Sequence, residues 1–226
     1  MKYDVCDLRS DGSSTPGVEA RAKWITGIDV SHHNGAVDWK TVAKGGTRFA
    51  FVKTTEGRDW ADPSFTGHFA ALKAAGIPRG AYHFYETDDD PLAQAQWFIE
   101  HVSLEAGDLP PVVDIEKITP PTPPTLTSDF GTFLDALYAH YGVEAIIYTG
   151  ERFWDHALKE HFPKHPLWIA AYDVAAPTIP QGWKAWTFWQ FTQDETLSGL
   201  KTPVDCSYFQ GDWAELQSIL LPTKKP

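Results

Sequence analysis

Residues 109–116 have the sequence LPPVVDIE, which predicts a buried β-strand ending in two carboxylates. Prolines cannot continue a helix, and the two valines are β-branched residues that favour strands. Because the side chains of a strand alternate between two faces, Asp114 and Glu116 should project from one face and Ile115 from the other. Neighbouring acids at the end of a buried strand repel each other, so one of them should have a raised pKa, as a general acid working near neutral pH requires. The alternative is a strand that ends in solvent and exposes both acids there.

Seven further apolar segments have the length and composition of strands, and helical segments alternate with them. These strands are predicted at residues 24–31, 48–55, 79–85, 145–149, 167–173, 186–191 and 204–209. The helices are predicted at residues 38–43, 62–76, 91–105, 128–141, 151–161 and 212–221. Such alternation indicates parallel βαβ units. Eight strands in 226 residues favour a closed barrel with some shortened connections. An open doubly wound sheet is the competing architecture, but no strand is followed by the glycine-rich phosphate loop of a nucleotide site.

The chain is predicted to form one domain with short extensions. Residues 1–23 contain turn signals and predict an irregular N-terminal arm, residues 24–221 form the barrel, and residues 222–226 are a tail. The proline-rich segment at residues 118–124 could be a linker between domains. Strands continue after this segment, however, and four strands would not close a barrel alone. We therefore expect a stiff loop at the rim of the barrel.

Composition and charge exclude several classes of partner. The net charge of −11 argues against nucleic acid, whose binding depends on Lys and Arg. No apolar run has the length of a membrane span, so we expect no membrane insertion. Residues 1–17 are interrupted by aspartates and lack the apolar core of a signal peptide. Three alternatives remain open: the signal was removed, export uses another route, or lysis releases the protein. Cys6 and Cys206 are either unrelated thiols or a disulfide between the arm and the end of the barrel.

Polar residues stand at or just beyond the C-terminal ends of the predicted strands. The acids are Asp29, Asp114, Glu116, Asp173 and Asp205, and the other polar residues are Thr54, Tyr85, Tyr148, Tyr172 and Gln190. In a parallel barrel those strand ends line one face, which is where the active sites of such barrels lie. For Asp173 a role in forming a turn is the better interpretation. Acids that recur at strand ends otherwise indicate a shared site.

Clustered carboxylates suit some kinds of chemistry better than others. We expect no metal and no cofactor, because the adjacent His32 and His33 would point in two directions and His83 is better explained as a packed or hydrogen-bonding residue. The G-x-S-x-G motif of a nucleophilic serine is missing, and no cysteine has an activating partner nearby in sequence. Acid/base hydrolysis of a glycosidic bond remains, since it needs two carboxyl groups and aromatic rings on which sugars stack.

Several motifs, in order along the chain, resemble glycoside hydrolase family 25, the Chalaropsis-type N-acetylmuramidases. They are GIDVSHHNG at 27–35, FVKTTEG at 51–57, GAYHFY at 80–85, VDIE at 113–116, WIAAY at 168–172 and WQF at 189–191. The resemblance covers about residues 25–213. It implies an α/β fold, an irregular, flattened TIM-like β/α barrel with eight strands and fewer than eight helices.

Carried over position by position, the resemblance implies a role for each polar residue of the site. Glu116 is the general acid, and Asp29, Asp114 and Asp205 complete the acidic cluster. Asp114 is either the nucleophile or the group that orients the N-acetyl group of the substrate, and a separation of ~5–5.5 Å between the carboxyls would favour retention. Tyr82, Tyr148, Tyr172 and Gln190 would line the sugar subsites. One departure is Ser207, which stands where the family usually has an asparagine.

The resemblance implies a peptidoglycan hydrolase that cleaves the β-1,4 bond between N-acetylmuramic acid and N-acetylglucosamine with net retention. A catalytically silent barrel that binds peptidoglycan or another glycan is the alternative, although it would not need clustered, mutually repelling acids. A chitinase-like enzyme would need a longer acidic series, whereas residues 110–113 are apolar. We expect a monomer that acts on glycan strands outside the cytoplasm. A phage lysin, a secreted lysozyme and an exported effector would all fit this sequence.

Overall fold

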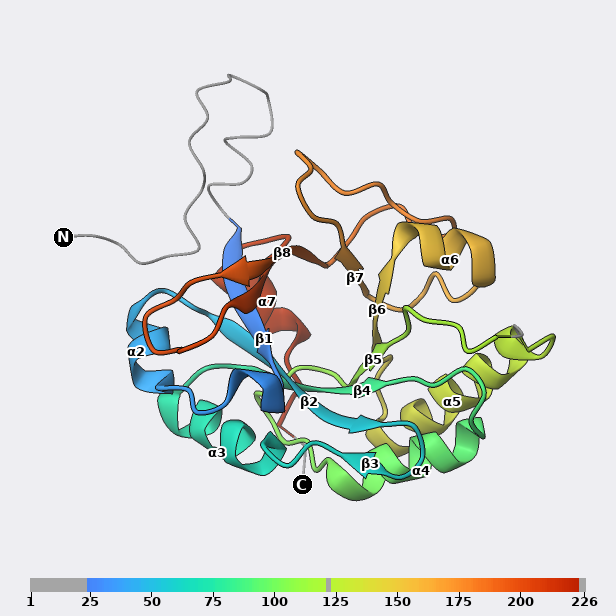
Figure 1. The fold of residues 1–226 in the computed structure, drawn as a ribbon, viewed down its shortest axis with the longest axis horizontal. Coiled ribbons are helices and arrows are strands. Elements are labelled where there is room, and N and C mark those ends of the chain that lie inside the picture. The colour runs from blue at the N-terminus through green and yellow to red at the C-terminus, as the bar shows by residue number, and fades with distance from the viewer. Residues whose placement is uncertain (1–23, 121–122, 224–226) are drawn as a thin grey trace.

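The computed structural model describes residues 24–120 and 123–223 (Figure 1). The expected N-terminal arm, Cys6 and the end of the tail lie outside these residues. The strands are β1 (Ile25–Val30), β2 (Phe49–Glu56), β3 (Trp60–Ala61), β4 (Arg79–Phe84), β5 (Val112–Asp114), β6 (Ile146–Gly150), β7 (Leu167–Ala170), β8 (Phe188–Glu195) and β9 (Val204–Phe209). The helices are the 3₁₀ turn η1 (His32–Asn34), α2 (Trp39–Lys44), α3 (Phe65–Ala75), α4 (Pro91–His101), α5 (Leu126–Tyr141), α6 (Glu151–Ala157) and α7 (Trp213–Ile219).

Eight of these strands close into a barrel. Their order is β1-β9-β8-β7-β6-β5-β4-β2, and β1 pairs with β2 to complete the ring. The two-residue β3 lies outside the ring and pairs only with the end of β2. An eight-stranded α/β barrel with fewer than eight helices is therefore confirmed. All eight predicted strands are present, while the helix predicted at 128–141 begins earlier, at Leu126, and that predicted at 91–105 ends at His101.

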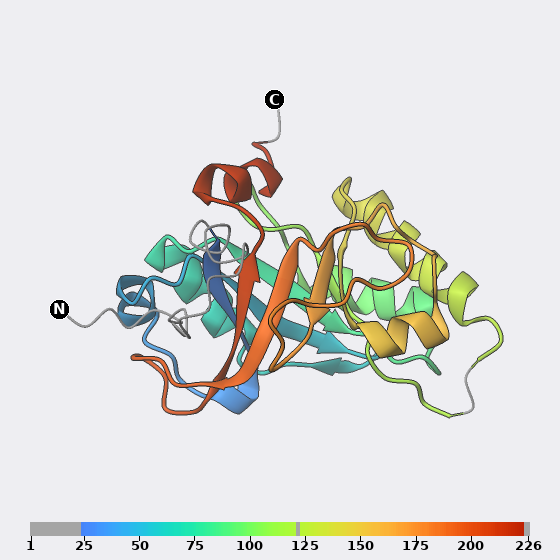
Figure 2. The same ribbon diagram turned by 90° about the horizontal axis from the view of Figure 1, so that it is seen from above.

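One strand runs against the others. β9 is antiparallel to both of its neighbours, β1 and β8, so the expectation of an all-parallel barrel is wrong at this point. The physical reason is the connection at residues 196–203, which holds no helix and is too short for the crossover that a parallel strand needs. Figure 2 shows the result, with α7 after β9 at one end of the barrel and the β8–β9 loop at the other.

Large aromatic side chains fill the interior of the barrel. Phe51 stacks on Trp168 with ring centroids 4.3 Å apart, and Phe188 lies 5.2 Å from Phe51. Small residues must face such rings: a Cβ on Gly80, which is level with Phe51 on the next strand, would lie 2.5 Å from the phenyl ring. The interior is therefore a packed core, and any site must lie at an end of the barrel.

Two different layers cover the outside of the barrel. Helices α3 and α4 pack on β2, and α4 packs on α5 (Figure 1). On the β7–β8–β9 side, outward-facing aromatic residues form a cluster of their own that includes Trp186, Trp189 and Tyr208. Among residues 24–120 and 123–223, no helix is long and apolar enough to cross a membrane.

Candidate active site

Four acids meet at one end of the barrel. Asp29 and Asp205 are directly opposite each other in the antiparallel β1–β9 pair. The reversal of β9 explains how they meet: Asp29 is near the end of β1, whereas Asp205 is the second residue of β9, not at its C-terminal end as predicted. Asp114 ends β5 and Glu116 follows it. Each of the four acids interacts electrostatically with at least one of the others, and these interactions shift their pKa values. The predicted cluster is therefore assembled.

A hydrogen bond joins the carboxyl groups of Asp29 and Asp205. Asp29 is 6% exposed, and burial raises its pKa well above the ordinary value, followed by repulsion from Asp205. Burial also raises the pKa of Asp205, to about 6, although a hydrogen bond from the Asp29 carboxyl lowers it. The two directions favour the protonated form of Asp29, whose carboxyl donates the hydrogen bond to Asp205.

Asp114 is buried at the end of its strand. Burial raises its pKa well above the ordinary value, repulsion from Glu116 adds to the rise, and Lys53 opposes it. Oxygen Oδ1 of Asp114 is buried and accepts no hydrogen bond within the described residues. A buried oxygen of this kind is costly, and it is an acceptor available to a substrate.

Glu116 lies at the mouth of the site. Although β5 ends at Asp114, the backbone N–H of Ile115 still donates to Tyr148 O at 3.0 Å, so the alternation of faces continues. Ile115 is fully buried in the helix layer, and Glu116 is exposed. Surrounding protein atoms nevertheless raise the pKa of Glu116, and the ammonium group of Lys53 counteracts part of this rise. Asp114 and Glu116 thus differ in solvent access despite being two residues apart.

Gln190 connects the acids to the tyrosines. Its Oε1 accepts hydrogen bonds from the hydroxyls of Tyr148 at 2.7 Å and Tyr172 at 2.5 Å. Its Nε2 donates to Asp29 Oδ2 at 2.9 Å, which lowers the pKa of that acid. Gln190 is level with the end of β7, but β8 continues for several residues beyond it, so Gln190 is not at a strand end as predicted. The network fixes one side of the site.

Tyr82 is the fourth predicted sugar-binding residue. It lies on β4 beside Lys53 of β2. Burial raises the pKa of its hydroxyl well above the ordinary value, and the next causes are the charges of Asp29 and Asp114. The structure thus brings Tyr82 into the group that contains the four acids, Gln190 and the other two tyrosines.

Some polar residues at the strand ends do not belong to this group. Tyr85 is 1% exposed and packs against Phe130 and Phe133 in the helix layer, and Thr54 is also 1% exposed. Strand alternation could have separated Tyr85 from Tyr82, because the two face opposite sides. Asp173 has a φ of 55°, in agreement with a turn.

Ser207 and His83 both have structural partners. Ser207, which replaces the asparagine usual in the family, accepts a hydrogen bond from Trp168 Nε1 at 3.0 Å inside the barrel. His83 is fully buried, bonds Thr55 at 2.8 Å and Gln94 at 3.2 Å, and has its pKa lowered by burial to about 3. The prediction that His83 is a packed, hydrogen-bonding residue is confirmed.

The sequence did not single out Lys53 as a member of the site. Its Nζ lies 2.6 Å from Glu56 Oε2 and 4.9 Å from the centroid of the Phe84 ring. Its charge lowers the pKa of both Asp114 and Glu116. The only available signal was its position within the FVKTTEG motif, in which a charged residue interrupts an apolar strand. Among the described residues, no group of three or more His, Cys, Asp or Glu side chains is arranged to hold a metal ion.

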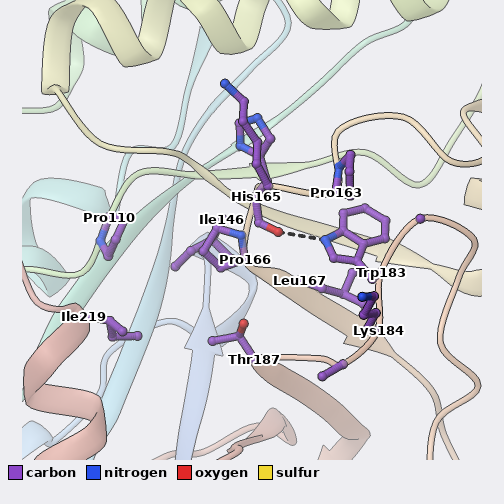
Figure 3. A pocket seen from close by; sticks show the side chains of 13 residues that line it. Pro110, Ile146, Pro163, His165, Pro166, Leu167, Trp183, Lys184, Thr187 and Ile219 are labelled. Atoms are coloured by element: carbon purple, nitrogen blue, oxygen red, sulfur yellow. Dashed lines mark hydrogen bonds between the residues drawn. The ribbon is translucent and has the colours of Figure 1, made fainter.

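A recess of about 470 Å³ lies away from this site (Figure 3). Its lining includes Ile146, Leu167 and Thr187, which stand where β6, β7 and β8 begin, so it opens at the other end of the barrel. Trp183 Nε1 donates to His165 O at 2.7 Å along its wall. No member of the acid cluster lines the recess, and the chemistry therefore belongs to the acid end.

A β/α barrel with clustered carboxylates and tyrosines at one end has the arrangement of a glycoside hydrolase. The sequence profile of glycosyl hydrolases family 25 matches residues 28–200, and the chain belongs to this family. Lysozyme M1 of Streptomyces globisporus is 33% identical over 209 residues, which cover 86% of this chain and 71% of the relative. The N,O-diacetylmuramidase of Chalaropsis sp is 30% identical over 183 residues, which cover 74% of this chain and 87% of the relative.

The fold comparison agrees with the sequence comparison. The crystal structure of the bacterial lysozyme from Streptomyces coelicolor superposes with a TM-score of 0.82 at 31% identity, covering 87% of this chain and 96% of that one. The chain is thus a glycoside hydrolase with the barrel of its family.

Proposed function

We propose that this protein is a peptidoglycan hydrolase that cleaves the β-1,4 bond between N-acetylmuramic acid and N-acetylglucosamine within glycan strands. The difference between Asp114 and Glu116 carries the proposal. One acid is exposed with a raised pKa, and the other is buried with an unpartnered oxygen. Hydrolysis of a glycosidic bond needs such a division, because one carboxyl must donate a proton while another stabilises or attacks the anomeric carbon.

In this proposal Glu116 is the general acid. Its raised pKa favours the protonated form relative to an ordinary glutamate, and its exposure allows the glycosidic oxygen to approach. The proton passes from the Glu116 carboxyl to that oxygen as the bond to the anomeric carbon breaks. The carboxylate then accepts a proton from the incoming water.

Asp114 acts at the anomeric centre, with net retention. Burial raises the pKa of Asp114, and two effects oppose that rise: the positive charge of Lys53 lowers the pKa, and the repulsion from Glu116 is lost when Glu116 holds the proton. Oδ1 is then available either to attack the anomeric carbon or to accept a hydrogen bond from the acetamido N–H that participates in the reaction. The tyrosines of the Gln190 network and Tyr82 bind the sugar at the acids, and Asp29 donates its hydrogen bond to Asp205 beside it.

The setting follows from the substrate. We propose that the protein acts outside the cytoplasm on cell-wall glycan strands, and that it does so as a monomer with residues 24–221 as one catalytic domain. Membership of the family and the similarity to Lysozyme M1 support this substrate.

The test is digestion of purified peptidoglycan followed by identification of the released fragments. We expect reducing ends of N-acetylmuramic acid, formed with the β anomer in excess at early times. Reducing N-acetylglucosamine ends would show that the enzyme cleaves a different bond from the one proposed. An initial excess of the α anomer would contradict retention. Binding without any release, from every wall type tried, would identify a silent barrel.

A further inference from the structure

Three aromatic rings stand beside the acid cluster and take no part in the chemistry above. His32 and His33 belong to η1, which follows β1, the strand that carries Asp29. Trp60 belongs to β3, at the end of β2. The His32 ring centroid lies 3.9 Å from that of His33 and 5.3 Å from that of Trp60. His33 is exposed and the other two are partly exposed, so the aromatic group His32–His33–Trp60 presents ring surface to solvent.

Buried polar contacts hold this aromatic group in place. Asp62 is 5% exposed, and its Oδ2 accepts hydrogen bonds from both the backbone N–H and the ring Nδ1 of His32, each at 2.9 Å. Its Oδ1 accepts from the hydroxyl of Ser64 at 2.6 Å. The indole of Trp97 donates to Trp60 O at 2.9 Å from behind. The His32 ring and the backbone at Trp60 are therefore held in place before any ligand arrives, which reduces the entropy lost on binding.

A charged pair links the aromatic group to the acids. Lys53 Nζ lies 5.3 Å from the centroid of the Trp60 ring and 2.6 Å from Glu56 Oε2. The same ammonium group is close enough to Asp114 and Glu116 to act on both electrostatically. Apolar ring surface and a charged pair thus adjoin each other next to the catalytic acids, as a sugar ring with polar substituents requires.

The strand order places this group across the barrel from the tyrosines. In the closed ring, β1 is separated from β6 by three strands in either direction, and β2 is likewise opposite β7. Tyr148 lies on β6 and Tyr172 just beyond β7, whereas the aromatic group follows β1 and β2. Figure 1 shows β7 and β3 on opposite sides of the barrel. A glycan bound at the tyrosines and passing over the acids would reach the aromatic group on the far side.

We propose that His32, His33 and Trp60 form a second sugar subsite, which binds an N-acetylated amino-sugar ring of the strand beyond the rings that flank the cleaved bond. The proposal rests on the proposed function and deepens it. The Trp60 indole and the two imidazoles bind the apolar face of the sugar, and Lys53 and Glu56 bind its polar substituents. The subsite makes the enzyme selective for long strands over short ones.

The test compares two lengths of peptide-free glycan, an N-acetylmuramyl-N-acetylglucosamine disaccharide, which spans only the cleaved bond, and an octasaccharide. For Trp60→Ala we expect the KM for the octasaccharide to rise about tenfold, with kcat and the values for the disaccharide nearly unchanged. Trp60→Phe should retain most of the affinity. Trp213→Ala is the matched control, because Trp213 is 42% exposed on α7 at the other end of the barrel. Calorimetric titration in the Glu116→Gln background should show the same loss for Trp60→Ala as a change in Kd.

A second variant keeps the test valid if Trp60→Ala is poorly folded. The ring of His33 is exposed, and its one ring contact within the described chain is with His32, so His33→Ala should fold normally and weaken octasaccharide binding about threefold. Native values for the octasaccharide in Trp60→Ala and His33→Ala would overturn the subsite while leaving the hydrolase intact. An equal loss on both lengths would also overturn it, because the rings would then contact the cleaved unit. Failure of the native protein to bind or cleave either length would reject the proposed function itself.

Discussion

Replacing Gln190 by leucine should destabilise the protein as well as inactivate it. The leucine removes an acceptor for two tyrosine hydroxyls and a donor to Asp29, all within 2.9 Å. Tyr172 is partly exposed and can bond to water instead, but Tyr148 and Asp29 are 7% and 6% exposed and stay buried. Each stranded buried group costs about 1–3 kcal/mol, so the free energy of unfolding should fall by about 4 kcal/mol. That is a large part of the ~5–15 kcal/mol typical of a domain.

Urea denaturation at pH 7 measures this loss directly. Gln96→Leu is the control, since Gln96 is exposed on α4 and its replacement should change the free energy of unfolding by less than about 0.5 kcal/mol. Combining Gln190→Leu with Tyr148→Phe removes one of the stranded hydroxyls, so the double variant should recover part of the stability. A loss below about 1 kcal/mol for Gln190→Leu, or strict additivity in the double variant, would refute the reasoning that these groups depend on one amide.

Three other predictions concern chemistry, pH and packing. Glu116→Gln should lower kcat on peptidoglycan by at least ~10²–10⁴-fold while Kd stays near the native value, and near-native turnover would remove Glu116 as the acid. Because the folded-state pKa of Asp205 is raised to about 6, this group makes the native protein lose stability as pH rises from about 4 to 6. Between pH 4 and pH 7 this contribution lowers the free energy of unfolding by about 2 kcal/mol, and urea denaturation at the two pH values should show that Asp205→Asn abolishes it. The same difference between the two pH values in Asp205→Asn and in the native protein would contradict this role of Asp205. Gly80→Ala should cost about 1–3 kcal/mol, because its Cβ would meet the Phe51 ring. Gly67→Ala in α3, where the space is open, should instead stabilise by up to ~1 kcal/mol, and equal melting temperatures for the two variants would be inconsistent with this packing.

The sequence predicted the strands well because their apolar runs are short and bounded by turn residues. It predicted the acid cluster for a reason that was only partly correct. Asp29 and Asp114 are at strand ends, as parallel topology requires, but Asp205 joins them because its strand is reversed. Strand direction depends on whether a connection can cross the barrel, and local sequence patterns do not encode that.

Other features depend on contacts that no local pattern reveals. Lys53 acquires its importance from Asp114 and Glu116, which are distant in the sequence. The role of Asp62 in fixing His32 likewise exists only after the chain has folded.

Closure of the barrel by β9 has a consequence for biosynthesis. Asp29 is among the first residues of the barrel to leave the ribosome, while its partner Asp205 is among the last, and the Gln190–Asp29 bond alone spans 161 positions. Contacts of such long range form late, since loop closure must come first. The nascent chain therefore carries a divided acid cluster until translation is almost complete. An enzyme capable of degrading a cell wall would in this way remain inactive throughout its own synthesis.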